Sequence, residues 1–268
     1  YVGVHRQLLC LDARTGERIW GLVVDDLVET SPGVIGSMLY FADASGTIYA
    51  LTLDRQGVAW RTPTGMAIYS SPAVWEGALY VGSTDFKVRR LNAQTGEIEW
   101  EFTTGGEVLT TPAYFGGAVF VGSCDHRLYC LDAATGAKRW EFQTGGEIHS
   151  SPAVSEPYVV FGSRDGCLYA VDIATGKRCW YFEAKDWVNS SPAVSDGVVY
   201  FGSHDHKVYA LEIETGVCLW EFETDGPVES TAAISEGTVY IGDDEGYLYA
   251  LDLESGRELW RYRTPEGE

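Results

Sequence analysis

Histidine is the side chain best suited to proton transfer and metal binding near neutral pH, and this chain has five histidines. His204 and His206 are separated by one residue, so both imidazoles can point the same way on a hairpin loop. Two ligands are too few for a zinc site. The chain also has no nucleophile elbow, phosphate loop or zinc-hydrolase motif. We therefore expect no metal site and no catalytic residue, and we regard the histidines as candidates for binding.

A repeat of forty residues determines where these side chains lie. A fixed period in this range predicts a solenoid or a propeller, because one unit cannot bury its apolar faces without neighbours. Seven units account for the whole chain. Tryptophan marks the repeat without insertion or deletion, at Trp20, Trp60, Trp100, Trp140, Trp180, Trp220 and Trp260.

Each unit predicts four short antiparallel strands. Segments rich in Val, Tyr, Phe and Leu, such as 198–201, 207–211 and 218–222, are bounded by Gly, Asp, Ser or Thr-Gly. We therefore predict an all-β fold, a seven-bladed β-propeller of four-stranded antiparallel blades, in which ring closure shields the sheet edges. We place the whole chain, 1–268, in one domain, with blades at approximately 1–23, 28–63, 68–103, 108–143, 148–183, 188–223 and 228–263.

The innermost strand of each blade is predicted from side-chain size, because little room is left near the axis. Small residues recur there, as in Ser190-Ser191-Pro192-Ala193, and proline is tolerated because this strand has one unpaired edge. The chain supplies six such segments for seven blades. Tyr1 enters its blade at the second strand, so we predict that the first blade lacks its inner strand and that the chain is part of a longer protein. The open edge would accept a strand from a partner.

Composition argues against two classes of partner. The chain has 39 acidic and 19 basic residues, a formal charge of −20, which repels nucleic acid and anionic lipid surfaces. No apolar run reaches membrane-spanning length, so we predict no membrane insertion. The six cysteines show no metal-ligand spacing and are expected as free thiols. The sequence leaves the cellular compartment open.

The segments that lead to each tryptophan are distinctive. Leu131-Asp132-Ala133-Ala134-Thr135-Gly136 precedes Trp140, and Val171-Asp172-Ile173-Ala174-Thr175-Gly176 precedes Trp180. They resemble the PQQ-like, BamB-type β-propeller repeat with its tryptophan-docking motif. The resemblance implies that the seven repeat tryptophans are structural docking residues, each packed on the neighbouring blade near its Thr-Gly turn. One unit departs from the pattern, because 53–57 lacks the Thr-Gly pair, and we expect a distorted turn there.

Some positions hold different residues from unit to unit. The fold does not require a particular residue there, so these positions can carry function. The residues just before the inner strands have little chemistry in common, and propeller geometry predicts that they surround the mouth of the central channel. The loops between second and third strands share this face, and all five histidines fall on it. The candidate binding residues are Glu29, Tyr69, Leu109, His149, Asn189 and Glu229 before the inner strands, together with Phe86, His126, Trp187 and His206.

A competing interpretation is that loop tips are simply variable and polar, and that histidine is a tolerated turn residue. For Trp187 a packing role is an equal alternative. Loop acids recur at one position of the repeat, which favours hairpin-turn chemistry for them: Asp85, Asp125, Asp165, Asp205 and Glu245.

These features favour a non-catalytic module, a scaffold or sensor of a larger protein, that binds a protein or peptide partner and needs no cofactor; a small-molecule ligand is the second option. One alternative is a quinoprotein dehydrogenase. For that class the resemblance implies eight blades, a vicinal disulfide and calcium-bound PQQ with a catalytic aspartate, whereas this chain has seven units and no adjacent cysteines. The other alternative is a purely structural accessory domain of a multidomain enzyme or kinase.

Overall fold

A computed structural model describes residues 1–54 and 57–265. All regular secondary structure in these residues is β-strand. The described part of the chain contains no helix that is long and apolar enough to cross a membrane. Arg55 and Gln56, where we predicted a distorted turn, lie outside the described residues.

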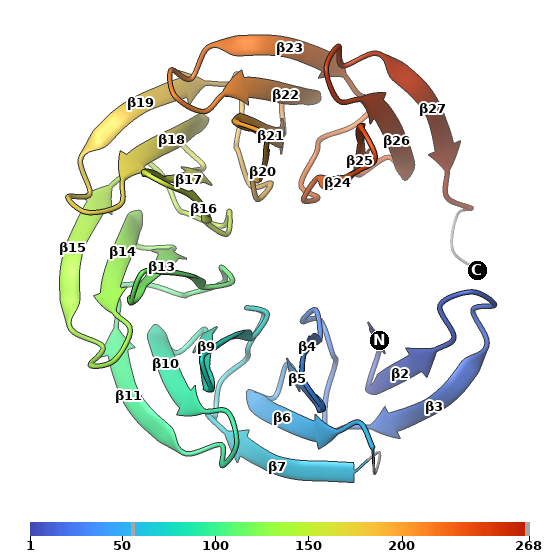
Figure 1. The fold of residues 1–268 in the computed structure, drawn as a ribbon, viewed down its shortest axis with the longest axis vertical. Coiled ribbons are helices and arrows are strands. Elements are labelled where there is room, and N and C mark those ends of the chain that lie inside the picture. The colour runs from blue at the N-terminus through green and yellow to red at the C-terminus, as the bar shows by residue number, and fades with distance from the viewer. Residues whose placement is uncertain (55–56, 266–268) are drawn as a thin grey trace. The chain divides into compact units, whose positions relative to one another are not determined.

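The strands form seven sheets, and within each sheet they are hydrogen-bonded in sequence order (Figure 1). In the described residues six sheets have four strands and the first has three, which confirms the predicted seven-bladed fold and a first blade without its inner strand. The sheets consist of β1 (Val2–Val4), β2 (Gln7–Leu11) and β3 (Arg18–Val23); β4 (Gly33–Ile35), β5 (Met38–Ala42), β6 (Thr47–Thr52) and β7 (Gly57–Pro63); β8 (Ala73–Trp75), β9 (Ala78–Gly82), β10 (Lys87–Asn92) and β11 (Ile98–Thr103); β12 (Ala113–Phe115), β13 (Ala118–Ser123), β14 (Arg127–Asp132) and β15 (Lys138–Gln143); β16 (Ala153–Ser155), β17 (Tyr158–Gly162), β18 (Cys167–Asp172) and β19 (Arg178–Glu183); β20 (Ala193–Ser195), β21 (Val198–Ser203), β22 (Lys207–Glu212) and β23 (Cys218–Glu223); β24 (Ala233–Ser235), β25 (Thr238–Gly242), β26 (Tyr247–Asp252) and β27 (Glu258–Arg263).

The described residues group into two compact units. Unit 1 comprises residues 1–125 and 130–139, and unit 2 comprises residues 126–129 and 140–268. Strands β14 and β15 have residues in both units. The assignment of the whole chain to one domain stays a prediction, and each unit is described by itself below.

The register of the strands positions the repeat tryptophan. In the sheet of β20 to β23, Tyr200 pairs with Ala210, which pairs with Trp220. A bulge follows directly after Ala210 and shifts the register of the last two strands. The same bulge follows Ala170 and Ala250 in the neighbouring sheets of unit 2. The tryptophan therefore lies at an equivalent position of each of these sheets.

The core of unit 2 lies between consecutive sheets. One apolar cluster contains Leu168 and Trp180 from one sheet with Phe201 and Leu211 from the next. Second and third strands are buried almost throughout, whereas the outermost strand alternates between exposed and partly buried residues. A single sheet therefore cannot bury its apolar surface without its neighbour, as the repeat predicts.

The serine or threonine before each first strand has a structural role beyond its small size. In unit 1, the Thr110 hydroxyl donates to the Gly122 carbonyl and accepts from the Gly122 N–H, both at 3.0 Å. In unit 2, Ser150 accepts from the N–H of Gly162 at 3.0 Å. These bonds fix the entry of the first strand to the end of the second. The first strands themselves begin later than predicted, after the proline in five units and after Ala232 in the last.

Each tryptophan of the central blades donates its indole N–H to a carbonyl 33 residues further on. In unit 2, Trp180 donates to the Ile213 carbonyl at 2.7 Å. The indole also covers the glycine of the next Thr-Gly turn, Gly216, which has φ of +72°, and a Cβ there would lie 2.7 Å from the ring. Glycine is required at this turn both by its left-handed backbone and by the indole that packs on it. The corresponding bonds are Trp60 to Ala93 and Trp100 to Ala133 in unit 1, and Trp140 to Ile173 and Trp220 to Leu253 in unit 2.

Candidate functional site

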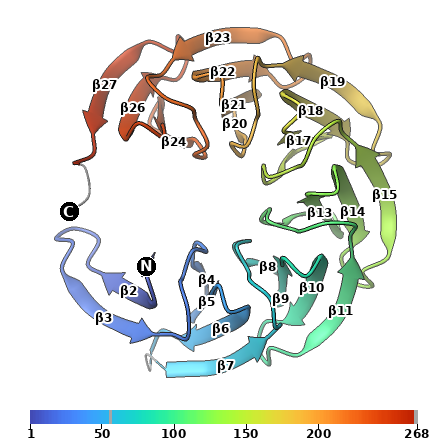
Figure 2. The ribbon, with the colours of Figure 1, turned by 180° about the vertical axis from the view of Figure 1, so that it is seen from behind.

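The loops of unit 2 bring polar and aromatic side chains from three consecutive blades into contact. Each blade contributes from the approach to its first strand and from the loop between its second and third strands. The approaches can be followed in Figure 2 from β19 to β20 and from β23 to β24. Seven residues make up this group, which we call the loop cluster: Glu147, His149, Arg164, Trp187, Asn189, His204 and Glu229.

Arg164 is the link between the first two blades of the cluster. Its Nη1 donates to Oε2 of Glu147 at 2.9 Å, and its Nε donates to Oδ1 of Asn189 at 3.2 Å. The guanidinium carbon lies 4.7 Å from the centroid of the Trp187 ring, within the range of a cation–π contact. Glu147 also pairs with Nε2 of His149 at 2.9 Å. The guanidinium is therefore oriented by three partners.

Asn189 extends the contacts to the third blade. Its Nδ2 donates to Oε1 of Glu229 at 2.9 Å, and Nε2 of His204 lies 2.6 Å from the same oxygen. The His204 ring also packs on Trp187, with ring centroids 5.4 Å apart. The contacts thus run without interruption from His149 to Glu229, and side chains connected in this way hold one another in place.

The cluster sets the charge states of its members. Burial lowers the pKa of His149, which favours the neutral imidazole. The hydrogen bond from His149 lowers the pKa of Glu147. Burial by itself would raise the pKa of Glu229, but hydrogen bonds from Asn189 and His204 bring it below the ordinary value. Burial, with the nearby charge of Glu229, raises the pKa of Asp244. Both glutamates of the cluster are therefore ionised at neutral pH.

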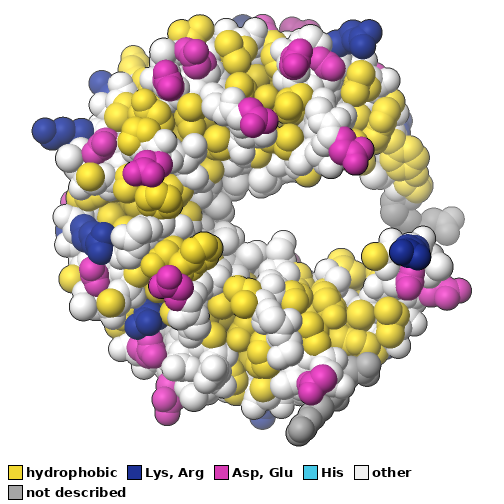
Figure 3. All heavy atoms as spheres, viewed as in Figure 1, with side chains coloured by type: hydrophobic (Ala, Val, Ile, Leu, Met, Phe, Trp, Pro, Cys, Tyr) yellow, Lys and Arg dark blue, Asp and Glu magenta, His cyan; other side chains and the backbone are white. Residues whose placement is uncertain are grey.

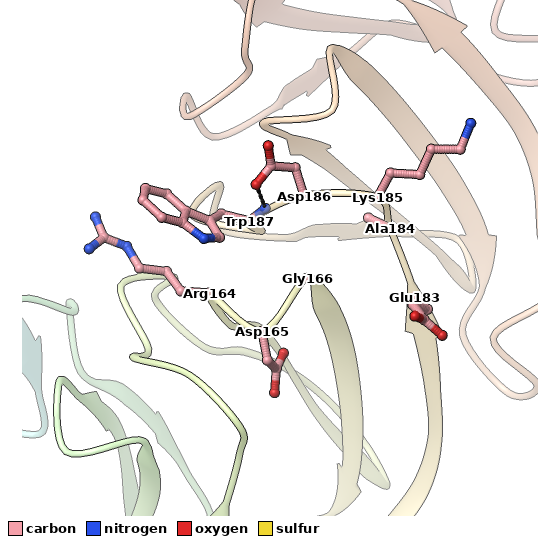
Figure 4. A pocket seen from close by; sticks show the side chains of 8 residues that line it. All are labelled: Arg164, Asp165, Gly166, Glu183, Ala184, Lys185, Asp186 and Trp187. Carbon is pink, nitrogen blue, oxygen red and sulfur yellow. Dashed lines mark hydrogen bonds between the residues drawn. The ribbon is translucent and has the colours of Figure 1, made fainter.

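A hollow of about 580 Å³ adjoins the cluster and includes two of its residues, Arg164 and Trp187 (Figure 4). Their side chains lie next to each other on one side of the hollow, while Lys185 points away on the other. Trp187 is 43% exposed although it is the largest side chain of the group. Both signs of charge and one exposed aromatic ring line this hollow, which suits a peptide better than a phosphate or a metal ion. Its full lining is Arg164, Asp165, Gly166, Glu183, Ala184, Lys185, Asp186 and Trp187.

Of the predicted site residues, the structure brings His149, Trp187, Asn189 and Glu229 together. Phe86, His126 and His206 are instead turn residues, with φ of 69°, 69° and 64°. Glycine occupies the same turn position in other units, as at Gly166 with φ of 84°. Glu29, Tyr69 and Leu109 belong to unit 1, where Glu29 and Tyr69 are exposed and Leu109 is partly buried.

The sequence prediction did not include Glu147 or Arg164, and it named His204 only as one of the five histidines on the binding face. The signal was present, because the position of Arg164 is also filled differently in every unit, by Ala44, Thr84, Cys124, His204 and Asp244. The face of the molecule shown in Figure 3 displays none of the histidines, all of which lie in the described residues.

The sheet topology and the tryptophan contacts define the class of protein, a seven-bladed β-propeller. The sequence matches the family described as outer membrane protein assembly factor BamB over residues 5–111, 103–186 and 164–268, and the chain belongs to this PQQ-like, BamB-type family. No curated protein matches the sequence.

Solved structures show the same fold. The crystal structure of BamB from Moraxella catarrhalis superimposes with a TM-score of 0.78 at 19% identity, over 88% of this chain and 76% of that one. The computationally designed Ika8 protein superimposes with a TM-score of 0.84 at 20% identity, over 94% of this chain and 79% of that one. At these identities the likeness concerns the fold.

Proposed function

We propose that this chain is a non-catalytic recognition module that binds a protein or peptide partner at the loop cluster of unit 2. One observation carries the proposal: Trp187 is exposed, yet Arg164 and His204 hold its ring in place. A fixed aromatic ring beside an oriented guanidinium is the arrangement found at binding hot spots, because little side-chain freedom is lost when a partner docks. BamB, whose family the chain shares, is an assembly factor by its description, which supports a protein as the kind of partner.

Two substitutions test this proposal while keeping the repeat intact. Unit 1 has Ala67 and Thr84 at the positions of Trp187 and Arg164, so Trp187→Ala and Arg164→Thr put tolerated residues there. Peptides selected from a random phage-displayed library against the native protein should bind each variant about 30-fold more weakly, since a hot-spot side chain contributes roughly 2 kcal/mol. The melting temperature should change little, because Trp187 is exposed and the ion pair that Arg164 forms with the half-exposed Glu147 contributes about 1 kcal/mol or less.

Val217→Lys is the control, because Val217 is 58% exposed on a turn outside the cluster. It should leave peptide binding unchanged. Selected peptides that bind the Trp187→Ala protein as well as the native protein would show that recognition takes place elsewhere.

The same proposal predicts that PQQ does not bind. The cofactor-binding relatives use a vicinal disulfide, whereas no two cysteines of this chain are adjacent in the sequence, so the residues do not fit the cofactor. Titration with PQQ and calcium should leave tryptophan fluorescence unchanged apart from the inner-filter effect. Saturable quenching at micromolar PQQ, with dehydrogenase activity towards alcohols or sugars, would instead support the quinoprotein alternative.

A further inference from the structure

Unit 1 carries three side chains that break the repeat and meet around one hollow. Arg90 stands where four other units have alanine, at Ala50, Ala170, Ala210 and Ala250. Trp75 stands where Ser155 and Ser195 occur in unit 2, and Tyr114 replaces a valine or isoleucine at every other first strand. All three line a hollow of about 150 Å³, which Tyr80, Glu76 and Ala133 also border. The other units have only alanine or cysteine at the position of Arg90, and serine, Ile35 or Phe115 at the position of Trp75. Three departures from the repeat that meet around one hollow point to a function.

The aromatic rings form a platform with one open face. Trp75 stacks on Tyr114 with centroids 5.1 Å apart and planes 22° from parallel, and Tyr114 in turn stacks on Tyr80 at 6.2 Å. Trp75 is nevertheless 50% exposed. Tyr114 covers one face of the indole, so the exposed area includes the other face. Hydrophobic side chains gather at the hairpin of β12 and β13 on the face seen in Figure 3.

Arg90 is partly buried at a position where four other units have alanine. Its Nη1 pairs with Oε2 of Glu99 at 2.6 Å, and its side chain is only 25% exposed. Its Nε is buried without a hydrogen-bond partner. An unsatisfied buried donor costs free energy that alanine would not. Arg90 nevertheless lines the hollow together with Tyr80 and Glu76, and its guanidinium interacts with the Tyr80 hydroxyl there.

The charges at the hollow argue against an ionic ligand. Arg90 is already paired with Glu99, and Glu76 stands nearby, 3.5 Å from the Tyr114 hydroxyl, so an anion meets more negative than positive charge. A cation would be repelled by the guanidinium of Arg90 at the same place. A proline-rich peptide needs a slot between two rings, whereas Trp75 and Tyr114 already stack on each other. A neutral ligand with one flat apolar face and polar edges remains.

We propose that this hollow binds a neutral sugar ring, such as the terminal residue of a saccharide, stacked on Trp75. The C–H groups on one face of a pyranose carry slight positive charge and pack on the negative face of an indole. The ring hydroxyls both donate and accept hydrogen bonds, which matches the donors of Arg90 and the carboxylate of Glu76. The volume equals that of roughly five water molecules, enough for one ring and too little for a chain. This site is separate from the loop cluster and does not depend on the function proposed there.

Cellobiose, maltose and chitobiose are the probes, titrated to about 50 mM, since a shallow site of this size binds with millimolar affinity. Saturation-transfer NMR detects the sugar, and the indole N–H resonance of Trp75 reports its place. At least one disaccharide should saturate and shift that resonance. Trp75→Ser, the residue of other units, should weaken binding at least about tenfold, and Arg90→Ala by roughly fivefold, each equivalent to about 1 kcal/mol or more. Trp187→Ala should leave the sugar affinity unchanged.

Three results would overturn the proposal. The first is that none of the three sugars saturates. The second is that binding survives in the Trp75→Ser protein with the same affinity. The third is that tetramethylammonium, inorganic phosphate or a proline-rich peptide shifts the Trp75 resonance at lower concentration than any sugar. Because Arg90→Ala introduces the residue of four other units, loss of folding cannot explain a loss of sugar binding in that variant if its melting temperature is retained.

Discussion

Replacing Trp180 by alanine is expected to lower the free energy of unfolding by about 3–5 kcal/mol, the usual cost of truncating a buried tryptophan. The indole is 8% exposed, donates to the Ile213 carbonyl at 2.7 Å and lies on Gly216. Its loss would leave a cavity between two sheets and an unpaired carbonyl. Denaturant unfolding measures the change, with a lower midpoint at unchanged slope.

Trp260 is a matched control, because it holds the same position of the repeat but is 45% exposed. Trp260→Ala should cost less than about 1.5 kcal/mol, since most of the contact area that a core tryptophan buries is not buried there. Equal losses in the two variants would mean that the tryptophan stabilises its own sheet and that docking on the next sheet contributes little.

The second large effect is expected at Arg89, whose side chain is 3% exposed and pairs with Asp85 and Glu101. Five other units have tyrosine at this position, at Tyr49, Tyr129, Tyr169, Tyr209 and Tyr249. Arg89→Ala should cost about 3–5 kcal/mol, because it leaves buried carboxylate charge without its partner. Arg89→Tyr should cost far less, since Tyr209 donates its hydroxyl to Asp205 at 2.6 Å in the equivalent arrangement. Denaturant midpoints of both variants check this.

The effect of Arg89 should depend on pH. Burial alone would raise the pKa of Asp85, but the hydrogen bonds and charge of Arg89 hold it below the ordinary value. Lys87 and Arg89 lower the pKa of Glu101. A carboxyl with a lowered pKa in the folded state stabilises the fold at neutral pH and loses that contribution as the pH falls through the lowered value. The stability difference between the native protein and Arg89→Ala should therefore shrink below about pH 4. A constant difference would assign the cost to packing.

The fold was predictable because seven units of the chain bury their apolar faces with the same pattern of residues. Tryptophan spacing, strand patterns and small residues before the first strands all repeat, so the structural role of each position is supported by several units. The sequence pattern did not predict the hydrogen-bond partner of each side chain. Small size alone placed Ser150 near the axis in the sequence prediction. In the structure its hydroxyl also accepts a hydrogen bond from the N–H of Gly162, which the pattern does not show.

The candidate site was predictable only in part, for the opposite reason. Residues that depart from the repeat have no copies to compare, so their contacts depend on side-chain geometry in neighbouring blades. His149 and Asn189 were found because their position varies, while Arg164, which connects their blades, was missed. Phe86 and His206 vary too, but their positive φ places them at turns that glycine fills elsewhere. Variation therefore shows that the fold does not require one residue type at a position, but it does not by itself identify a binding residue.

The tryptophan bonds also bear on how fast each unit folds. Each links residues 33 positions apart, about a quarter of the length of one unit, and the more numerous strand pairings link residues that are much closer in the sequence. Folding rates of small proteins fall as the mean sequence separation of contacts rises, and β-sandwiches are slow because their strands pair over long distances. A blade here meets its neighbours soon after it is made. We therefore expect each unit to fold at a rate nearer that of mixed α/β domains than that of a sandwich, although every one of its elements is a strand.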